Sequence, residues 1–262
     1  MFTLLDLVQP DTIDEAYQIL MAKRNNAILG GCAFLRLGSS RIGTGIELSK
    51  LNLNYITEQT DYIEIGAMTT FRDLETNLIL QEYFNGVLPK AVGNIIGVQF
   101  RNVVTVGASV YAKYGFSDLI TALLALDTEV ELYKGGRMPL VEFLGRAYEK
   151  DFLTKIFIKK DQRKVAYQNF RSSASDFPIL NVAVSKADHQ WIIAVGAMPS
   201  RAKIAYQASA ELSKGNLKCD DIAAIAADEL VFGTNAKATG EYRKAISKVL
   251  ITRAIQEVLQ WK

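Results

Sequence analysis

Arg101-Asn-Val-Val-Thr-Val-Gly-Ala-Ser-Val-Tyr-Ala-Lys-Tyr-Gly-Phe-Ser-Asp118 is the most informative stretch of this sequence. The β-branched run 103–106 leads into the small residues Gly107-Ala108-Ser109, and the apolar, helix-like run 119–126 follows. Small residues after a strand let backbone N–H groups approach a ligand closely, and a turn of such donors binds anions. We therefore predict a strand at 103–106 that ends in one half of a phosphate-binding turn.

A second glycine turn supplies the other half. Gly30 and Gly31 follow a short apolar strand at 27–29, after a helix that begins at the capping box of Thr12 and Glu15 and runs to about residue 23. The order strand, helix, strand is βαβ-like and aims this turn at a ligand. Two separated turns suggest a long ligand. Because Gly-x-Gly-x-x-Gly is absent, we assign no Rossmann domain.

Five motifs occur in a fixed order along the chain. They are Gly-Gly-x-x-x-Leu at 30–35, Ile-Gly-Ala-x-Thr-Thr at 65–70, Arg-Asn-x-x-Thr-Val-Gly-Ala-Ser at 101–109, Tyr-Gln-Asn-Phe-Arg-Ser-Ser-Ala-Ser-Asp at 167–176, and Glu-Tyr-Arg at 241–243. Each is weak alone. Together they span nearly the whole chain and resemble the FAD-binding subunit of the molybdenum hydroxylases, the family of xanthine dehydrogenase and carbon monoxide dehydrogenase.

The resemblance implies an α+β fold in two domains. Residues 1–162 are expected to form a two-part FAD-binding domain of the para-cresol methylhydroxylase type, and residues 163–262 a small three-stranded antiparallel sheet with a helical bundle. The residue patterns agree, because a charged segment at 159–164 precedes three strand-like runs and three helical patterns. The predicted strands are 165–170, 180–185 and 191–196, and the predicted helices are 202–212, 220–230 and 241–259.

The resemblance also implies which residues bind FAD, mainly through backbone amides near the diphosphate. The first set is Ile28, Leu29, Gly30, Gly31, Cys32, Ala33 and Phe34, and the second is Thr105, Gly107, Ala108 and Ser109. Asp118 stands at the family's acidic position that hydrogen-bonds the cofactor, Gln168 where some members have lysine, and Phe177 where a side chain approaches the flavin. Alternatively, Gly30-Gly31 is only a tight turn, and Ser117 or Asp118 only caps a helix.

The chain departs from the family pattern at several of these positions. Cys32, Ala33 and Ala108 replace residues that commonly add side-chain hydrogen bonds or a glycine, although backbone donors survive the changes. Gln168 removes the positive charge that a lysine would bring. Cys32 could hold flavin covalently as a thiolate, but a small buried thiol that fills the turn is the favoured interpretation.

Other side chains have both a functional and a structural interpretation. Tyr111, Tyr114 and Phe177 could cover the flat flavin ring, or could simply pack in a core. Arg101 and Lys113 could meet a phosphate or a partner, but solvated charges are commoner. His189 is the only histidine and is expected in a polar turn, so we predict no Ser/His/Asp catalysis. No catalytic residue and no metal site are assigned to this chain.

Composition excludes some classes of function. The 30 basic and 28 acidic residues nearly cancel, so nothing points to nucleic acid or an anionic membrane. The two cysteines, Cys32 and Cys219, show no Cys-x-x-Cys spacing, which argues against a zinc or iron–sulfur site in this chain and fits a reducing compartment. No run of apolar residues is long enough for a membrane span, and a cytoplasmic location is expected.

The favoured function is therefore that of an oxidoreductase subunit. By the resemblance, a partner chain holds the molybdenum cofactor, another holds iron–sulfur clusters, and FAD on this chain delivers the electrons to an acceptor such as NAD. Two alternatives stay open. One is a stand-alone flavin oxidase or dehydrogenase of the same fold, and the other is a structural subunit that has lost FAD.

Overall fold

The computed structural model describes residues 1–261, which divide into two compact units of interleaved segments. The first unit comprises Met1–Asp73, Gly97–Ala112 and Thr128–Ile158; the second comprises Leu74–Ile96, Lys113–Asp127 and the chain from Lys159 onward. Because these units are not contiguous in sequence, they do not decide where two sequential domains would divide. The boundary between residues 162 and 163 stays a prediction.

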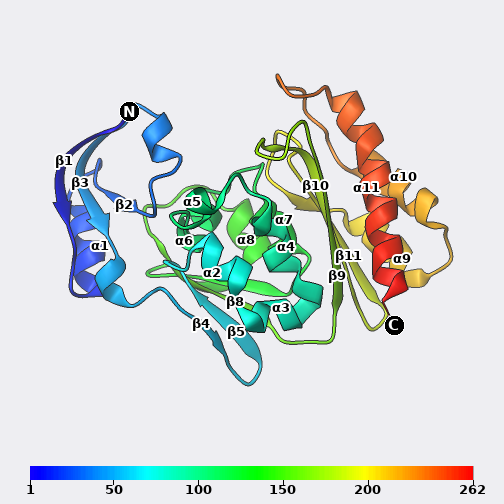
Figure 1. Ribbon diagram of the computed structural model, residues 1–262, viewed down its shortest axis with the longest axis horizontal. Coiled ribbons are helices and arrows are strands. Elements are labelled where there is room, and N and C mark those ends of the chain that lie inside the picture. Colours follow the sequence, from blue (N-terminus) through cyan, green and yellow to red (C-terminus); the bar gives the residue numbers. More distant parts are fainter. Residues whose placement is uncertain (262) are drawn as a thin grey trace. The chain divides into compact units, whose positions relative to one another are not determined.

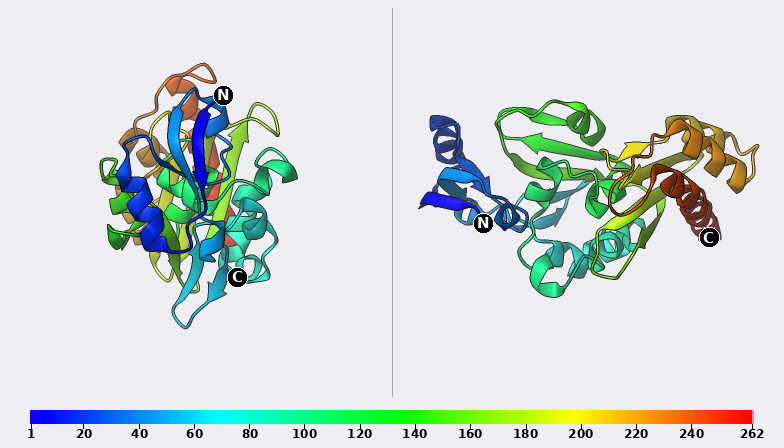
Figure 2. Two further views of the ribbon diagram at one scale, coloured as in Figure 1. Left: turned by 90° about the vertical axis from the view of Figure 1, so that its left-hand side faces the viewer. Right: turned by 90° about the horizontal axis from the view of Figure 1, so that it is seen from above.

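The first unit opens with a small parallel sheet (blue in Figures 1 and 2). Its strand order is β1-β3-β2, and α1 packs on it through Ala16 and Leu20. The predicted helix cap is confirmed, since the Thr12 hydroxyl accepts from the Glu15 amide at 3.2 Å. These elements are β1 (Thr3–Val8), α1 (Ile13–Ala22), β2 (Ala27–Leu29), the 3₁₀ turns η1 (Leu35–Leu37) and η2 (Ser49–Leu51), and β3 (Arg41–Glu47).

A five-stranded sheet of order β4-β5-β8-β6-β7 also belongs to the first unit, apart from Lys159 at the end of β8. Its strands are β4 (Ile56–Glu58), β5 (Tyr62–Gly66), β6 (Thr128–Leu132), β7 (Gly136–Pro139) and β8 (Leu153–Lys159). Three short helices belong to the same unit: α5 (Val98–Arg101), α6 (Val106–Tyr111) and α8 (Leu140–Gly145). A further helix, α2 (Phe71–Thr76), begins in the first unit and ends in the second.

The predicted strand at 103–106 is wrong. Only an isolated bridge joins Thr105 to Thr70, and α6 begins at Val106. The physical reason is the Thr105 side chain, which accepts from the Ala108 amide and caps the helix. Gly107 then lets α6 approach the chain at Ala67 closely, because a Cβ at Gly107 would lie 2.7 Å from the Ala67 Cβ. Local capping has overridden the β-branched pattern.

The second unit is built on an antiparallel sheet of order β12-β11-β10-β9. The three predicted strands are confirmed as β9 (Lys164–Arg171), β10 (Pro178–Ala187) and β11 (Gln190–Gly196), and the two-residue β12 (Lys203–Ile204) extends the edge. Three helices, α9 (Tyr206–Lys214), α10 (Cys219–Glu229) and α11 (Gly240–Gln260), share a core with this sheet. Figure 1 shows α11, in red, running along β9 and β10.

The opposite face of this sheet carries α7 (Asp118–Leu124), which contacts β10 and β11. Strand β10 is therefore buried on both faces, and its residues from Pro178 to Ser185 are all buried. The remaining elements of the second unit are α3 (Leu78–Glu82), η3 (Tyr83–Gly86) and α4 (Val87–Gly93). Over residues 1–261, none of the helices combines the length and apolarity that a bilayer crossing requires. The fold is α+β, as predicted.

Candidate functional site

In the first unit the two predicted turns lie against each other. A Cβ built on Gly30 would stand 2.6 Å from the Ala108 Cβ and 2.8 Å from the Thr105 Oγ1. A Cβ on Gly31, whose φ is +71°, would stand 1.6 Å from the Val103 carbonyl oxygen. No side chain fits at either glycine without displacement of the neighbouring segment. The structure therefore brings the first set of predicted residues together with the second.

The backbone after these glycines is available to bind a ligand. Within residues 1–261, no hydrogen bond uses the N–H of Gly31, Cys32 or Ala33 as its donor. Gly31 and Cys32 both adopt positive φ, with Cys32 at 57°, and Gly31 is exposed. Consecutive free amides in a partly exposed turn form a concave anion site. A phosphate or diphosphate is the type of ligand that such amide donors bind.

The segment 105–109 contributes differently from the expectation. The amides of Val106, Gly107 and Ala108 already donate to Thr69 O, Ala67 O and Thr105 Oγ1, at 2.8, 2.8 and 3.3 Å. These three amides are thus not free donors for a phosphate. The Ser109 hydroxyl is half-buried and has no hydrogen bond within the described chain. This segment packs against the glycine turn and can offer the Ser109 hydroxyl as a donor, while the free amides come from the glycine turn.

The other predicted residues of the first unit frame the turn. Ile28 and Leu29 end β2, and Leu29 is buried. Ala33 and Phe34 are half-buried and lead into η1, where the Arg36 amide donates to the Cys32 carbonyl at 3.1 Å. The glycine turn is thus held between a strand and a 3₁₀ turn.

Burial raises the pKa of the Cys32 thiol above its ordinary value. At neutral pH the thiolate is therefore scarce, because the raised pKa lies further above neutral pH than that of an ordinary thiol. We expect acid precipitation of the flavin-loaded chain to release all of its flavin, and Cys32→Ser to release the same amount. Colour retained in the wild-type pellet, and lost from the pellet of the variant, would show a covalent bond instead.

In the second unit, Asp118 is the buried acceptor of a dense polar cluster at the start of α7. Its Oδ1 accepts from Arg171 Nη2 at 2.6 Å, from Asn181 Nδ2 at 3.3 Å and from the Tyr167 hydroxyl. The pKa of Tyr167 is raised well above its ordinary value by burial and by the charge of Asp118, so this phenol stays protonated and donates. Ser117 is the residue that caps α7.

Gln168 lies on the other face of the same sheet. Its Nε2 donates to Glu257 on α11, which also pairs with Lys90 at 2.6 Å. Successive residues of a strand point to opposite faces, so Tyr167 faces α7 while Gln168 faces α11. The structure therefore does not bring Gln168 together with Asp118.

Three aromatic side chains of the second unit form a cluster. The rings of Tyr114 and Phe116 stack with centroids 5.1 Å apart, and Phe116 meets Phe177 at 4.6 Å. Phe177 is 36% exposed and is therefore accessible to a ligand. Tyr111, in the first unit, has its hydroxyl bonded to Glu149 O and to the Asp151 amide, which supports a packing role.

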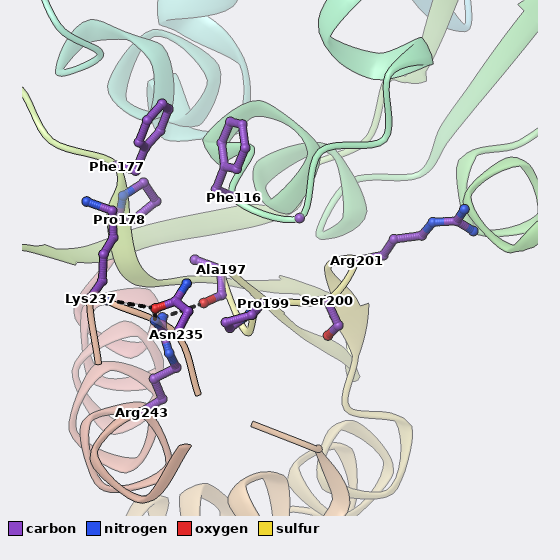
Figure 3. Close-up of a pocket in the computed structure, with 11 residues that line it drawn as sticks. Phe116, Phe177, Pro178, Ala197, Pro199, Ser200, Arg201, Asn235, Lys237 and Arg243 are labelled. Carbon is purple, nitrogen blue, oxygen red and sulfur yellow. Dashed lines mark hydrogen bonds between the residues drawn. The ribbon is translucent and has the colours of Figure 1, made fainter. Parts of the chain in front are cut away.

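A pocket of about 340 Å³ opens beside this cluster (Figure 3). Aromatic rings on one side face polar and cationic groups on the other, and Figure 3 shows Phe116 and Phe177 across from Asn235 and Arg243. Lys237 pairs with Asp176 and lies 5.7 Å from the Phe177 ring centroid. The lining residues are Gly115, Phe116, Phe177, Pro178, Ala197, Pro199, Ser200, Arg201, Asn235, Lys237 and Arg243.

The sequence patterns did not reveal the cationic and amide side chains beside Asp118 and in the pocket. Arg171 and Arg243 stood inside motifs of the resemblance but received no role, and Asn235 and Lys237 carried no pattern. The available signal was an arginine in or next to an apolar strand or helix face, which must find buried partners. Arg101 also proves to be buried, so a solvated charge does not explain it. His189 lies exposed in the turn between β10 and β11, as expected.

Comparison with known proteins assigns both parts of the chain. Residues 2–160 match the family model of the FAD binding domain in molybdopterin dehydrogenase, and residues 165–258 match that of the CO dehydrogenase flavoprotein C-terminal domain. The chain is 24% identical to the uncharacterized protein YgfM of Escherichia coli K12 over 247 residues, which cover 93% of this chain and 92% of that one.

One further relative and one solved structure match nearly the whole chain. The glyceraldehyde dehydrogenase medium chain of Sulfolobus acidocaldarius is 24% identical over 273 residues, covering 96% of this chain and 97% of its own. The structure of reconstituted CO dehydrogenase from Oligotropha carboxidovorans has the same fold, with a TM-score of 0.87, 18% identity and 98% coverage of both chains. The chain therefore belongs to the FAD-binding subunits of the molybdenum hydroxylases, with FAD as its cofactor, and is an oxidoreductase subunit.

Proposed function

We propose that this chain passes electrons from the iron–sulfur clusters of a partner chain, through FAD, to an acceptor such as NAD, in a complex whose third chain holds the molybdenum cofactor. The observation that carries the proposal is the glycine turn with its three free amides. The relative named as a medium chain supports a multi-chain enzyme. Both cysteines are free thiols, which fits a cytoplasmic complex.

The first unit supplies the diphosphate-binding groups in this proposal. The amides of Gly31, Cys32 and Ala33 donate to phosphate oxygens, and the bare Cα atoms of Gly30 and Gly31 allow close approach. The Ser109 hydroxyl adds a further donor. When bound, FAD supplies the redox chemistry, and the protein supplies its position and its electronic environment.

The second unit supplies groups for the flavin ring and for the acceptor. Asp118 offers a buried carboxylate to a ring N–H, and the exposed Phe177 offers an aromatic face. The pocket of Phe116, Phe177, Asn235 and Lys237 combines aromatic and cationic groups. That combination suits an acceptor with a planar ring and an anionic group, as NAD has. Gln168 stays a proposed neighbour of the cofactor only by resemblance, because it faces α11.

Lys237→Met tests the acceptor pocket. Removal of this ammonium takes away a cation and leaves Asp176 without its partner beside the pocket. We expect KM for NADH to rise about tenfold, which corresponds to about 1.4 kcal/mol, while kcat stays unchanged. The measurement is steady-state NADH oxidation by the complete complex, in the reverse direction in which NADH reduces the flavin, with an artificial electron acceptor present to reoxidise the flavin.

Lys244→Met is the matched control, because Lys244 also pairs with an aspartate of its own unit but does not line the pocket. It should leave KM unchanged. If neither variant alters KM, or if NADH fails to bleach the flavin of the wild-type complex, NAD is not the acceptor at this pocket.

A further inference from the structure

All hydrogen bonds to the Asp118 carboxylate converge on a single oxygen. Oδ1 accepts from Arg171, Asn181 and Tyr167, and within residues 1–261 no group donates to Oδ2. The side chains of Asp118 and Arg171 are only 5% and 8% exposed. A carboxylate so held cannot rotate freely, because rotation would break a buried charged hydrogen bond. The free oxygen thus has a fixed direction.

Each of the three nitrogens of the Arg171 guanidinium donates a hydrogen bond. Its Nη1 donates to the Asp176 carbonyl at 2.7 Å and its Nε to Asn169 Oδ1 at 3.1 Å, while Nη2 holds Asp118. It is the last residue of β9, next to an irregularity in the pairing with β10 between Pro178 and Leu180. A planar guanidinium with three fixed donors can orient a carboxylate in a way that a lysine cannot.

Asn181 strengthens the arrangement from the neighbouring strand. Its Nδ2 donates to Asp118, and its Oδ1 accepts from the Thr121 hydroxyl at 2.9 Å. Thr121 lies one turn beyond Asp118 on α7, so β9, β10 and α7 all contribute to one network. Apart from Asp118 Oδ2, the polar groups that form this network are hydrogen-bonded to one another, which restricts the motion of their side chains.

We propose that Arg171 is a positioning residue of the flavin site, which with Tyr167 holds the Asp118 carboxylate so that its free Oδ2 is presented to the flavin. This inference rests on the proposed contact between Asp118 and FAD. Arg171 has a second effect, because its positive charge lies against the carboxylate and balances it. A positive charge near the flavin favours the reduced cofactor, so Arg171 also keeps the flavin easier to reduce.

The test uses the full chain loaded with FAD and measures both the Kd for FAD and the flavin midpoint potential. Arg171→Gln should raise Kd at least about thirtyfold and lower the potential, because it removes both the orientation and the charge. Arg171→Lys keeps the charge, so its potential should stay near that of the wild type while Kd still rises. Tyr167→Phe removes only an orienting bond and should raise Kd with little change in potential.

Arg163→Gln is the matched control for the loss of a buried arginine. Arg163 lies in the same unit, is also 8% exposed and pairs with Asp161 at 2.7 Å, but it has no contact with the Asp118 network. It should lower the melting temperature and leave Kd and potential unchanged. If Arg171→Gln behaves as Arg163→Gln does, the positioning role is wrong. If Arg171→Gln does not fold, Arg171→Lys and Tyr167→Phe decide.

The same data separate this inference from the proposed function. A wild-type chain that binds no FAD would overturn both. A wild-type chain that binds FAD, together with Arg171 and Tyr167 variants that bind it equally well at the same potential, would overturn the positioning role alone.

Discussion

Gly31→Ala is expected to weaken FAD binding severely and to destabilise the first unit. The new Cβ would lie 1.6 Å from the Val103 carbonyl oxygen, so the glycine turn and the segment around Val103 must move apart. Positive φ adds about 1–2 kcal/mol for any residue with a Cβ. We expect Kd for FAD to rise at least about a hundredfold, and the free energy of unfolding to fall by about 3 kcal/mol or more. Fluorescence titration with FAD and urea unfolding measure the two effects.

Gly136→Ala separates the clash from the backbone strain. Gly136 has a φ of +69° in the same unit, but a Cβ there would meet nothing within 4 Å. This variant should cost only about 1 kcal/mol and bind FAD normally. Normal FAD binding by Gly31→Ala would refute the proposed role of the glycine turn in binding FAD, because the turn would then tolerate a side chain.

Arg243→Ala is expected to have the largest effect on the stability of the second unit. Arg243 is 1% exposed, and its guanidinium donates to the Ala197 carbonyl at 2.8 Å, to the Ile179 carbonyl and to Asn235. Burial lowers its pKa, and its Nε has no partner within the described chain, so the native arrangement already bears a desolvation cost.

Truncation nevertheless lowers the free energy of unfolding, because the loss of these contacts outweighs the desolvation cost that it removes. It leaves two buried carbonyls unpaired and a cavity between β10 and α11. Together these should lower the free energy of unfolding by about 3–5 kcal/mol. Arg253→Ala is the control, since Arg253 is exposed on the same helix and should change stability by less than about 0.5 kcal/mol. Equal urea midpoints for the two variants would show that the buried contacts of Arg243 contribute nothing.

Local sequence signals predicted those parts of the fold that local interactions determine. Thr12 and Glu15 marked the start of α1 because a cap needs only neighbouring residues. The apolar, strand-like runs within 165–196 predicted β9, β10 and β11, because strands that pack against helices bury most of their apolar side chains. The run at 103–106 failed, since its β-branched residues favour a strand while the Thr105 side chain caps a helix. No window of sequence reveals which of the two effects is stronger.

The site was predictable only where a residue type is itself the signal. Gly30 and Gly31 indicated a turn in which a side chain does not fit. Arg171 and Tyr167 reach Asp118 across 53 and 49 positions of the chain, so no spacing rule could pair them. The sequence likewise could not show that the amides of 106–108 already donate hydrogen bonds to Thr69, Ala67 and Thr105.

The most direct test of the account is the visible absorption spectrum of the purified full chain, recorded before and after acid precipitation, with the released flavin identified chemically. We expect the bands of bound oxidised flavin and, after precipitation, free FAD in the supernatant. A chain that stays colourless after incubation with excess FAD, or that releases only FMN, would contradict it.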